Sequence, residues 1–187
     1  MDNVPVRKRN RLENYDYSQP GAYYVTICTL GHQPFGVINL GSGRPEAAPT
    51  SLMQLSPLGK IVEAEITRLS HIYDGVYVDS YIVMPNHVHM IIVIRSNSGR
   101  AQPAPTVSRM IQQWKGAISK KTNNPIWQKG FYDKIIRNND DYQRIVWEIR
   151  NNPATWEQDE YYVGNNRSYA APQATGSRRG GLCPPGM

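Results

Sequence analysis

The alternation of apolar and polar positions predicts several β-strands along the chain. Runs rich in Tyr, Val, Ile and Thr, bounded by turn residues, are typical of strands. They span residues 22–30, 35–40, 76–84, 87–94 and, as a strand or an extended segment, 125–138. We expect the second run to pair with the first through a turn near residues 31–34. Residues 91–94 are apolar on both faces, which places their strand at the centre of its sheet.

Helical periodicity marks three further segments. The clearest is residues 55–73, where Ser56 can cap the helix and Pro57 suits its first turn. A second helix is predicted over residues 106–121 and a third over residues 140–151, before Pro153. An apolar stripe in the first helix, interpreted as core, consists of Leu58, Ile61, Val62, Ile66 and Leu69. The order of elements predicts an α+β domain with an antiparallel sheet.

Composition divides the chain into an arm, a domain and a tail. Residues 1–20 carry a basic cluster, residues 21–163 hold the predicted elements, and residues 164–187 have the composition of a disordered tail. The chain has 21 Lys and Arg against 15 Asp and Glu, a net charge of +6, which favours an anionic partner such as nucleic acid. No apolar run approaches the length of a membrane span. We therefore expect no membrane contact and a cytoplasmic location.

The segment YIVMPNHVHMIIVI, residues 81–94, places two histidines inside an apolar strand. Residues i and i+2 of a strand point the same way, so His87 and His89 project together while Val88 points to the opposite layer. Two imidazoles this close can chelate one divalent cation. A motif this short also fits two ordinary hydrogen-bonded histidines, and it supplies no third ligand.

Together with other segments, this motif resembles the small single-tyrosine transposases of bacterial insertion sequences, which carry a histidine–hydrophobe–histidine (HUH) motif. It is most similar to the branch associated with repetitive extragenic palindromes. The other matching segments, which extend the resemblance over most of residues 7–162, are YDYSQPGAYYVTICT (15–29), IWQKGFYDKIIRNNDDYQRI (126–145) and NNPATWEQDEYY (151–162). The resemblance implies a ferredoxin-like α+β fold, an antiparallel sheet with helices packed on one face.

The resemblance also implies binding of single-stranded or hairpin DNA, and metal-dependent cleavage and transfer of a strand. In the family, Mg²⁺ or Mn²⁺ is held by the two histidines and a polar side chain, and a tyrosine attacks the phosphodiester to form a 5′-phosphotyrosine. The polar ligand follows the tyrosine by one helical turn, on the same face. The matching residue is Asn152, which can alternatively just close the helix before Pro153. Related transposases act as monomers or homodimers, and both states stay open here.

The chain departs from the family at the nucleophile. Glu148 stands one helical turn before Asn152, where the family has tyrosine. Tyr142 is an alternative nucleophile, but it lies on the apolar side of the helix and is interpreted as core. Tyrosines without the required spacing are Tyr132, Tyr161 and Tyr162. A carboxylate at position 148 favours loss of strand transfer, and leaves open a hairpin-binding protein that does not cut or a metal-dependent nuclease that uses water.

Basic and aromatic side chains predict contact with nucleic acid. Lysines can follow phosphates while aromatic faces stack on unpaired bases. The candidates are Arg7, Lys8, Arg9, Arg11, Lys115, Lys120, Lys121, Trp127, Lys129 and Arg137. The arm fits a solvated chain end equally well, and Trp127 fits a place in the core.

Overall fold

The structure is a computed structural model that describes residues 15–30, 35–38, 53–96 and 105–162. Most of the predicted basic arm and the whole predicted tail lie outside these residues. The same holds for four of the candidate DNA contacts, Arg7, Lys8, Arg9 and Arg11.

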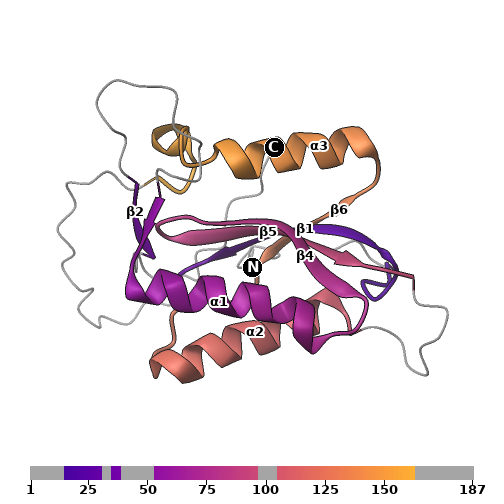
Figure 1. The fold of residues 1–187 in the computed structure, drawn as a ribbon, viewed down its shortest axis with the longest axis horizontal. Coiled ribbons are helices and arrows are strands. Elements are labelled where there is room, and N and C mark those ends of the chain that lie inside the picture. The colour runs from indigo at the N-terminus through magenta and orange to yellow at the C-terminus, as the bar shows by residue number, and fades with distance from the viewer. Residues whose placement is uncertain (1–14, 31–34, 39–52, 97–104, 163–187) are drawn as a thin grey trace, which may run out of the picture.

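Four strands form an antiparallel sheet in the order β4-β5-β1-β6 (Figure 1). The strands are β1 (Gly21–Cys28), β4 (Val76–Val83), β5 (His87–Ile94) and β6 (Tyr132–Ile136). β1 pairs with β5 along its whole length, from Gly21 opposite Ile94 to Cys28 opposite His87, and with β6 on its other edge. The prediction that β5 is a central strand is therefore confirmed.

The next two strands, β2 (Gly36–Ile38) and β3 (Met53–Leu55), form a separate two-stranded sheet. The prediction that the run at 35–40 pairs with the first strand is wrong, because β5 and β6 already occupy both edges of β1. Gly36 lets the pair approach closely, since a Cβ there would lie 2.3 Å from the backbone oxygen of Gln54.

The three predicted helices are present, with boundaries close to those expected. They are α1 (Pro57–Ile72), α2 (Val107–Thr122) and α3 (Asn139–Asn151), and a short 3₁₀ helix, η2 (Trp156–Gln158), follows α3. Ser56, Thr106 and Asn138 cap the three α-helices by accepting hydrogen bonds from backbone N–H groups of their first turns. Each helix thus begins where the sequence supplies a cap.

The helices cover both faces of the sheet, with α1 and α2 below it and α3 above it in Figure 1. The α+β class with an antiparallel sheet is confirmed, but the helices were expected on one face and α3 lies on the other. The strands explain this, because successive residues of β5 enter different cores. Val88 and Met90 pack with α1 and α2, whereas Ile91 packs with Ile145 and Ile149 of α3. A sheet that is apolar on both faces needs cover on both.

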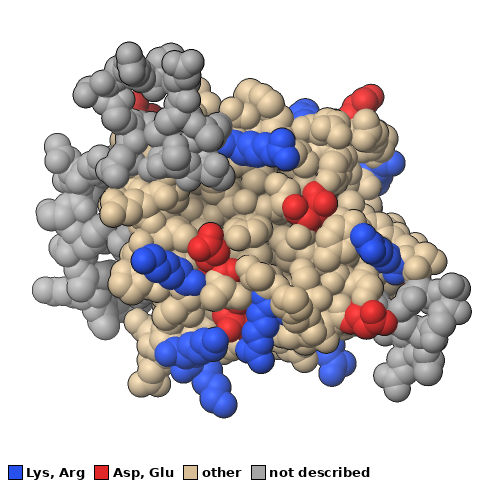
Figure 2. All heavy atoms as spheres, in the orientation of Figure 1, with Lys and Arg blue, Asp and Glu red and all other residues tan. Residues whose placement is uncertain are grey.

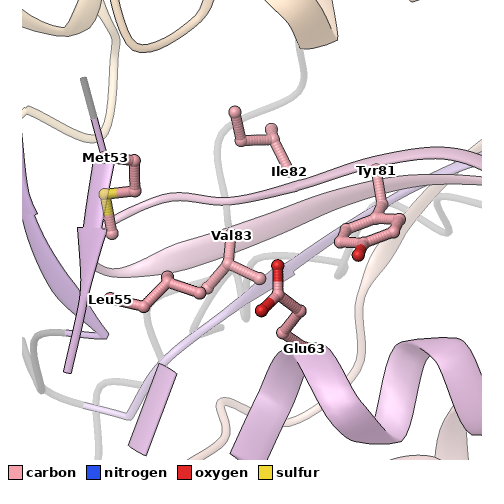
Figure 3. Close-up of a pocket in the computed structure, with 6 residues that line it drawn as sticks. All are labelled: Met53, Leu55, Glu63, Tyr81, Ile82 and Val83. Atoms are coloured by element: carbon pink, nitrogen blue, oxygen red, sulfur yellow. The ribbon is translucent and has the colours of Figure 1, made fainter. Parts of the chain in front are cut away.

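A pocket of about 190 Å³ lies beside the β2-β3 sheet, between it, α1 and β4 (Figure 3). Its lining is mainly apolar, with Glu63 and Tyr81 as polar groups. Neither histidine of β5 lines it, so the pocket has no part in the candidate metal site.

Among the described residues, no helix has both the length and the apolar character that crossing a membrane requires.

Candidate functional site

The two histidines of β5 meet at their outer ring nitrogens. His87 and His89 are 0% and 5% exposed, and their Nε2 atoms lie 2.9 Å apart. They share the α3 side of the sheet with Ile91, two residues further along the strand. The rings therefore project together, as their spacing predicts.

The inner ring nitrogens of both histidines have polar partners. Nδ1 of His87 lies 2.9 Å from Oδ1 of Asn86, and the Asn86 amide nitrogen donates to the backbone carbonyl of Tyr161 at 2.8 Å. Nδ1 of His89 lies 2.7 Å from the hydroxyl of Tyr24 and 2.9 Å from that of Thr26. Partners on Nδ1 orient each ring and direct Nε2 into the space between them.

Burial keeps both imidazoles neutral. The loss of hydration lowers the pKa of His89 to about 3. It also lowers the pKa of His87 well below its ordinary value, and the neighbouring His89 adds to that effect. A neutral imidazole carries a free ring lone pair, and this is the form that binds a metal ion.

Asp159 is a third member of the cluster. One ligand atom from each of His87, His89 and Asp159 lies within 4.8 Å of the other two. Burial raises the pKa of the Asp159 carboxyl, while hydrogen bonds from the Tyr161 backbone and the Asn152 side chain act in the opposite direction. The Tyr161 N–H donates to Oδ1 of Asp159 at 2.7 Å. The sequence pattern gave no signal for Asp159, because it lies in an irregular turn after η2.

Asn152, the predicted third ligand, ends α3 beside this cluster. Asn152 is 6% exposed, and its side-chain oxygen is buried and has no hydrogen-bond partner among the described residues. Its side chain forms a hydrogen bond with Asp159, a member of the cluster. Buried oxygens are almost always paired in proteins, so an unpartnered one beside three ligand-type groups indicates a site for a cation or a water molecule.

The donor set fits a divalent cation. Two nitrogens held about 2.1 Å from one ion at right angles lie about 3.0 Å apart, and the observed separation is 2.9 Å. The imidazoles of His87 and His89, the carboxylate of Asp159 and the amide oxygen of Asn152 are all suitable ligands for such an ion. The structure therefore brings the two predicted histidines together, adds the carboxylate of Asp159, and places the Asn152 side chain next to that carboxylate.

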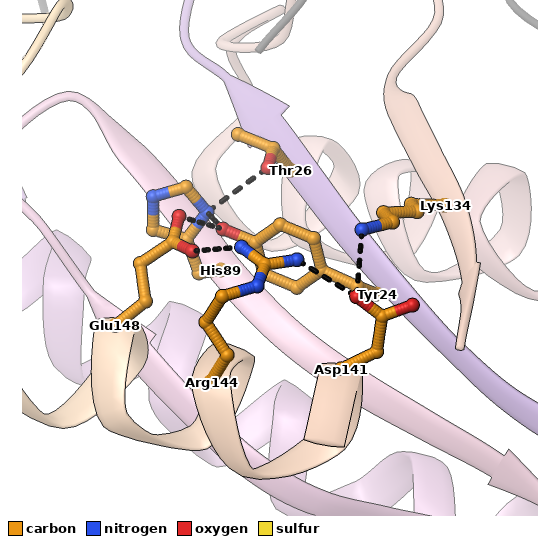
Figure 4. A network of polar contacts seen from close by, with 7 residues as sticks. All are labelled: Tyr24, Thr26, His89, Lys134, Asp141, Arg144 and Glu148. Carbon is orange, nitrogen blue, oxygen red and sulfur yellow. Dashed lines mark hydrogen bonds and ion pairs between the residues drawn. The ribbon is translucent and has the colours of Figure 1, made fainter. Parts of the chain in front are cut away.

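Glu148 lies next to the cluster without belonging to it. The Tyr24 hydroxyl, which contacts His89, donates to Oε1 of Glu148 at 3.3 Å. Figure 4 shows this contact continuing along the polar side of α3. The Arg144 guanidinium lies 3.8 Å from Oε2 of Glu148 and 3.0 Å from Oδ1 of Asp141. The residue at the nucleophile position is thus one side chain away from a candidate metal ligand.

The alternative nucleophile Tyr142 is directed elsewhere. Its hydroxyl donates to the carboxylate of Asp79 in β4. This hydrogen bond, together with partial burial, raises the pKa of Tyr142 to about 12. Of the other tyrosines, Tyr161 packs on His87 with ring centres 4.6 Å apart, and Tyr24 stacks on His89 at 5.4 Å. A role of Tyr142 as nucleophile gains no support from these contacts.

The candidate DNA contacts on α2 lie on the face of the sheet opposite the histidines. The Lys115 amine donates to the backbone carbonyls of Gln128 and Gly130, and Lys121 pairs with the buried Glu65. The remaining described lysine and arginine candidates, all exposed, are Lys120, Lys129 and Arg137. Figure 2 shows basic side chains interspersed with acidic ones on the face in view, rather than gathered in one patch.

Trp127 and Trp147 lie in different environments. Trp127, a candidate for base stacking, packs against Phe35 and Trp114, with ring centres 5.4 and 4.9 Å apart, and joins the core below the sheet. Trp147 on α3 is instead 64% exposed, and Arg144 and Arg150 lie three residues before and after it. The sequence contains a signal for Trp147, because it falls opposite Ile145 and Ile149 in the helical repeat.

The chain is similar to an uncharacterised protein of Haemophilus influenzae. The two are 31% identical over 179 residues, which cover 84% of this chain and 93% of that protein. The chain belongs to the family of this Haemophilus protein. The match spans nearly the whole relative, so the family includes the domain that carries the histidine pair. No family model matches the chain.

Among solved structures, the fold is similar to that of a REP-associated tyrosine transposase bound to a REP hairpin. The TM-score is 0.52 at 17% sequence identity, and the match covers 89% of this chain and 99% of that one. The fold therefore confirms the resemblance of this chain to that class of transposases.

Proposed function

We propose that the protein binds single-stranded or hairpin DNA at a divalent-metal centre on the α3 side of its sheet. The observation that carries the proposal is the convergence of the Nε2 atoms of His87 and His89, 2.9 Å apart, with the carboxylate of Asp159. The hairpin bound by the transposase of similar fold supports DNA as the partner. Such a protein would act in the cytoplasm, as a monomer or a homodimer.

His87, His89, Asp159 and Asn152 are the residues that would hold Mg²⁺ or Mn²⁺. A bound divalent cation polarises a phosphodiester and neutralises the charge that develops on it. The chain's own residues hold this centre in shape. Asn86 orients one ring, with Nδ1 of His87 2.9 Å from its side-chain oxygen. Burial of both rings keeps water from competing for their lone pairs.

DNA contacts are proposed on the same face as the metal centre. Arg144 and Arg150 flank Trp147 on the exposed side of α3, and Lys134 of β6 joins Arg144 through Asp141. Arginines can follow phosphates while an exposed indole stacks on an unpaired base. The part of the exposed candidates Lys120, Lys129 and Arg137 in binding stays a separate prediction, since Lys120 lies on α2, on the opposite face of the sheet.

We propose that the protein does not form a phosphotyrosine at position 148. Glu148 lacks the phenol that makes the covalent link in the family, so binding is the function that the site supports best. A second function, hydrolysis by water, is favoured by one observation. The Glu148 side chain is 44% exposed beside the cluster and can therefore take a proton from a water molecule.

The test incubates the protein with a labelled DNA hairpin that carries a single-stranded flank, in Mn²⁺. We expect a shifted band on a native gel and an uncut strand on a denaturing gel. Glu148→Tyr should add a band that contains protein covalently linked to DNA, and a second change, His87→Ala, should remove this band. Free cleaved DNA from the unmodified protein would support hydrolysis instead. Absence of any shifted band would contradict the proposed function.

A further inference from the structure

We propose that Glu148 is a positioning residue for His89, acting through the hydroxyl of Tyr24. In this proposal, which rests on the proposed metal centre, Glu148 selects the His89 tautomer whose Nε2 is free for a cation. Tyr24 is 6% exposed, and its hydroxyl oxygen lies 2.7 Å from Nδ1 of His89 and 3.3 Å from Oε1 of Glu148. Figure 4 shows the three side chains converging from β5, β1 and α3.

The argument depends on the single proton of the Tyr24 hydroxyl. A carboxylate oxygen only accepts, so the phenol donates its proton to Glu148. The phenol oxygen is then available as an acceptor for Nδ1–H of His89, 2.7 Å away, and the hydroxyl oxygen of Thr26, 2.9 Å from the same nitrogen, can accept from it as well. A neutral imidazole carries one N–H, so a proton on Nδ1 leaves Nε2 with a free lone pair.

His87 reaches the same state through a different partner. Its Nδ1 faces the side-chain oxygen of Asn86 at 2.9 Å, and that amide's orientation is set because its nitrogen donates to the carbonyl of Tyr161. Nδ1 of His87 therefore donates, and its Nε2 is free as well. Two free lone pairs 2.9 Å apart repel each other, and a cation between them removes this repulsion.

Loss of the acceptor at position 148 would reverse the tautomer of His89. The Tyr24 proton would turn to Nδ1 of His89, and the ring would carry its own proton on Nε2. That N–H would donate to Nε2 of His87 and close the pair without a metal. Arg144 supports the present arrangement, since it lies 3.8 Å from Oε2 of Glu148 and leaves Oε1 to Tyr24.

The experiment compares Glu148→Leu, which removes the acceptor, with Glu148→Gln, which keeps an acceptor oxygen. Calorimetry with Mn²⁺ should give an affinity about 10- to 100-fold lower for the leucine variant, as for other partners of metal-bound histidines. The glutamine variant should stay close to the unmodified protein. Tyr142→Phe, which removes a hydroxyl bound to Asp79 instead, should leave the affinity unchanged. In a Tyr24→Phe background, exchanging Glu148 for Leu should have no further effect.

A second readout needs no metal. Nitrogen-15 NMR of the imidazoles in EDTA should show His89 protonated on Nδ1 in the unmodified protein and on Nε2 in Glu148→Leu. The same tautomer in both, with equal Mn²⁺ affinities, would overturn the proposal. If the unmodified protein bound no Mn²⁺, the metal centre of the proposed function would fail. The NMR comparison would still decide whether Glu148 sets the tautomer.

Discussion

The unpartnered oxygen of Asn152 leads to a prediction about stability. Leaving a buried polar group without a hydrogen bond costs about 1–3 kcal/mol, whereas an ordinary hydrogen bond contributes about 1 kcal/mol. Asn152→Leu has a similar volume, removes the buried oxygen, and loses the amide's hydrogen bond to Asp159. Without metal, we therefore expect the variant to match the unmodified protein or to exceed its free energy of unfolding by up to about 2 kcal/mol.

Metal should reverse this order. A ligand that binds only the folded state adds about 2.7 kcal/mol at 100 times its dissociation constant. We expect Mn²⁺ to stabilise the unmodified protein by an amount of this size and Asn152→Leu by clearly less, because the variant lacks one candidate ligand. Urea denaturation in EDTA and in Mn²⁺ measures both quantities. Asn151→Leu is the matched control, since its amide donates to the backbone carbonyl of Trp147 and not to the cluster.

Two results would refute this reasoning. A loss of more than about 1 kcal/mol in EDTA would mean that the Asn152 oxygen is satisfied in the metal-free protein. An unchanged Mn²⁺ effect would mean that Asn152 is no ligand. Both together would return Asn152 to the simpler role of closing α3, with its backbone N–H bonded to the carbonyl of Glu148.

Two further predictions concern other residues of the domain. Burial lowers the pKa of the Lys115 ammonium to about 8, below its value in the unfolded chain. The unfolded state then binds more protons between these two values, so stability should rise with pH from about 8 to about 10. Lys115→Met should remove about 1–2 kcal/mol of that rise, after allowance for solvent screening. Urea denaturation of both proteins at several pH values measures this, and parallel pH profiles would contradict it. Trp147→Ala should weaken binding of a hairpin with a single-stranded flank about 5- to 100-fold while leaving a blunt hairpin unaffected, as measured by fluorescence anisotropy; equal losses for both DNAs would contradict stacking on an unpaired base.

Local sequence patterns were sufficient to predict the helices and strands. They were insufficient to predict which strands pair with each other. Ser56 and Pro57 mark the start of α1 because capping depends on residues within one turn. The partner of the run at 35–40 could not be obtained in this way, since pairing depends on which edges of β1 remain free. Those edges are occupied by β5 and β6, which lie far along the chain.

The same distinction applies to the candidate site. His87 and His89 were accessible from sequence because strand alternation alone places them side by side. Asp159 was not, because η2 and the irregular turn after it have no period that fixes a direction. Tyr24 is separated from its contact His89 by 65 positions and has no motif of its own. The exposure of Trp127 could not be predicted from sequence either. Lysines near it suggested a surface role, whereas its ring packs against Trp114.

In the proposed function, metal and DNA binding use residues other than the one needed for strand transfer. The candidate ligands come from β5, from the end of α3 and from the turn after η2, and none of them depends on a tyrosine at position 148. Glu148 reaches the cluster only through Tyr24, by hydrogen bonds of 3.3 and 2.7 Å. A glutamate in place of the family's tyrosine can therefore remove the nucleophile while the ligands keep their positions, because the carboxylate still accepts the Tyr24 proton. A protein of this kind that had lost cleavage would therefore still be expected to bind the metal and the hairpin, because the proposed functions use different atoms.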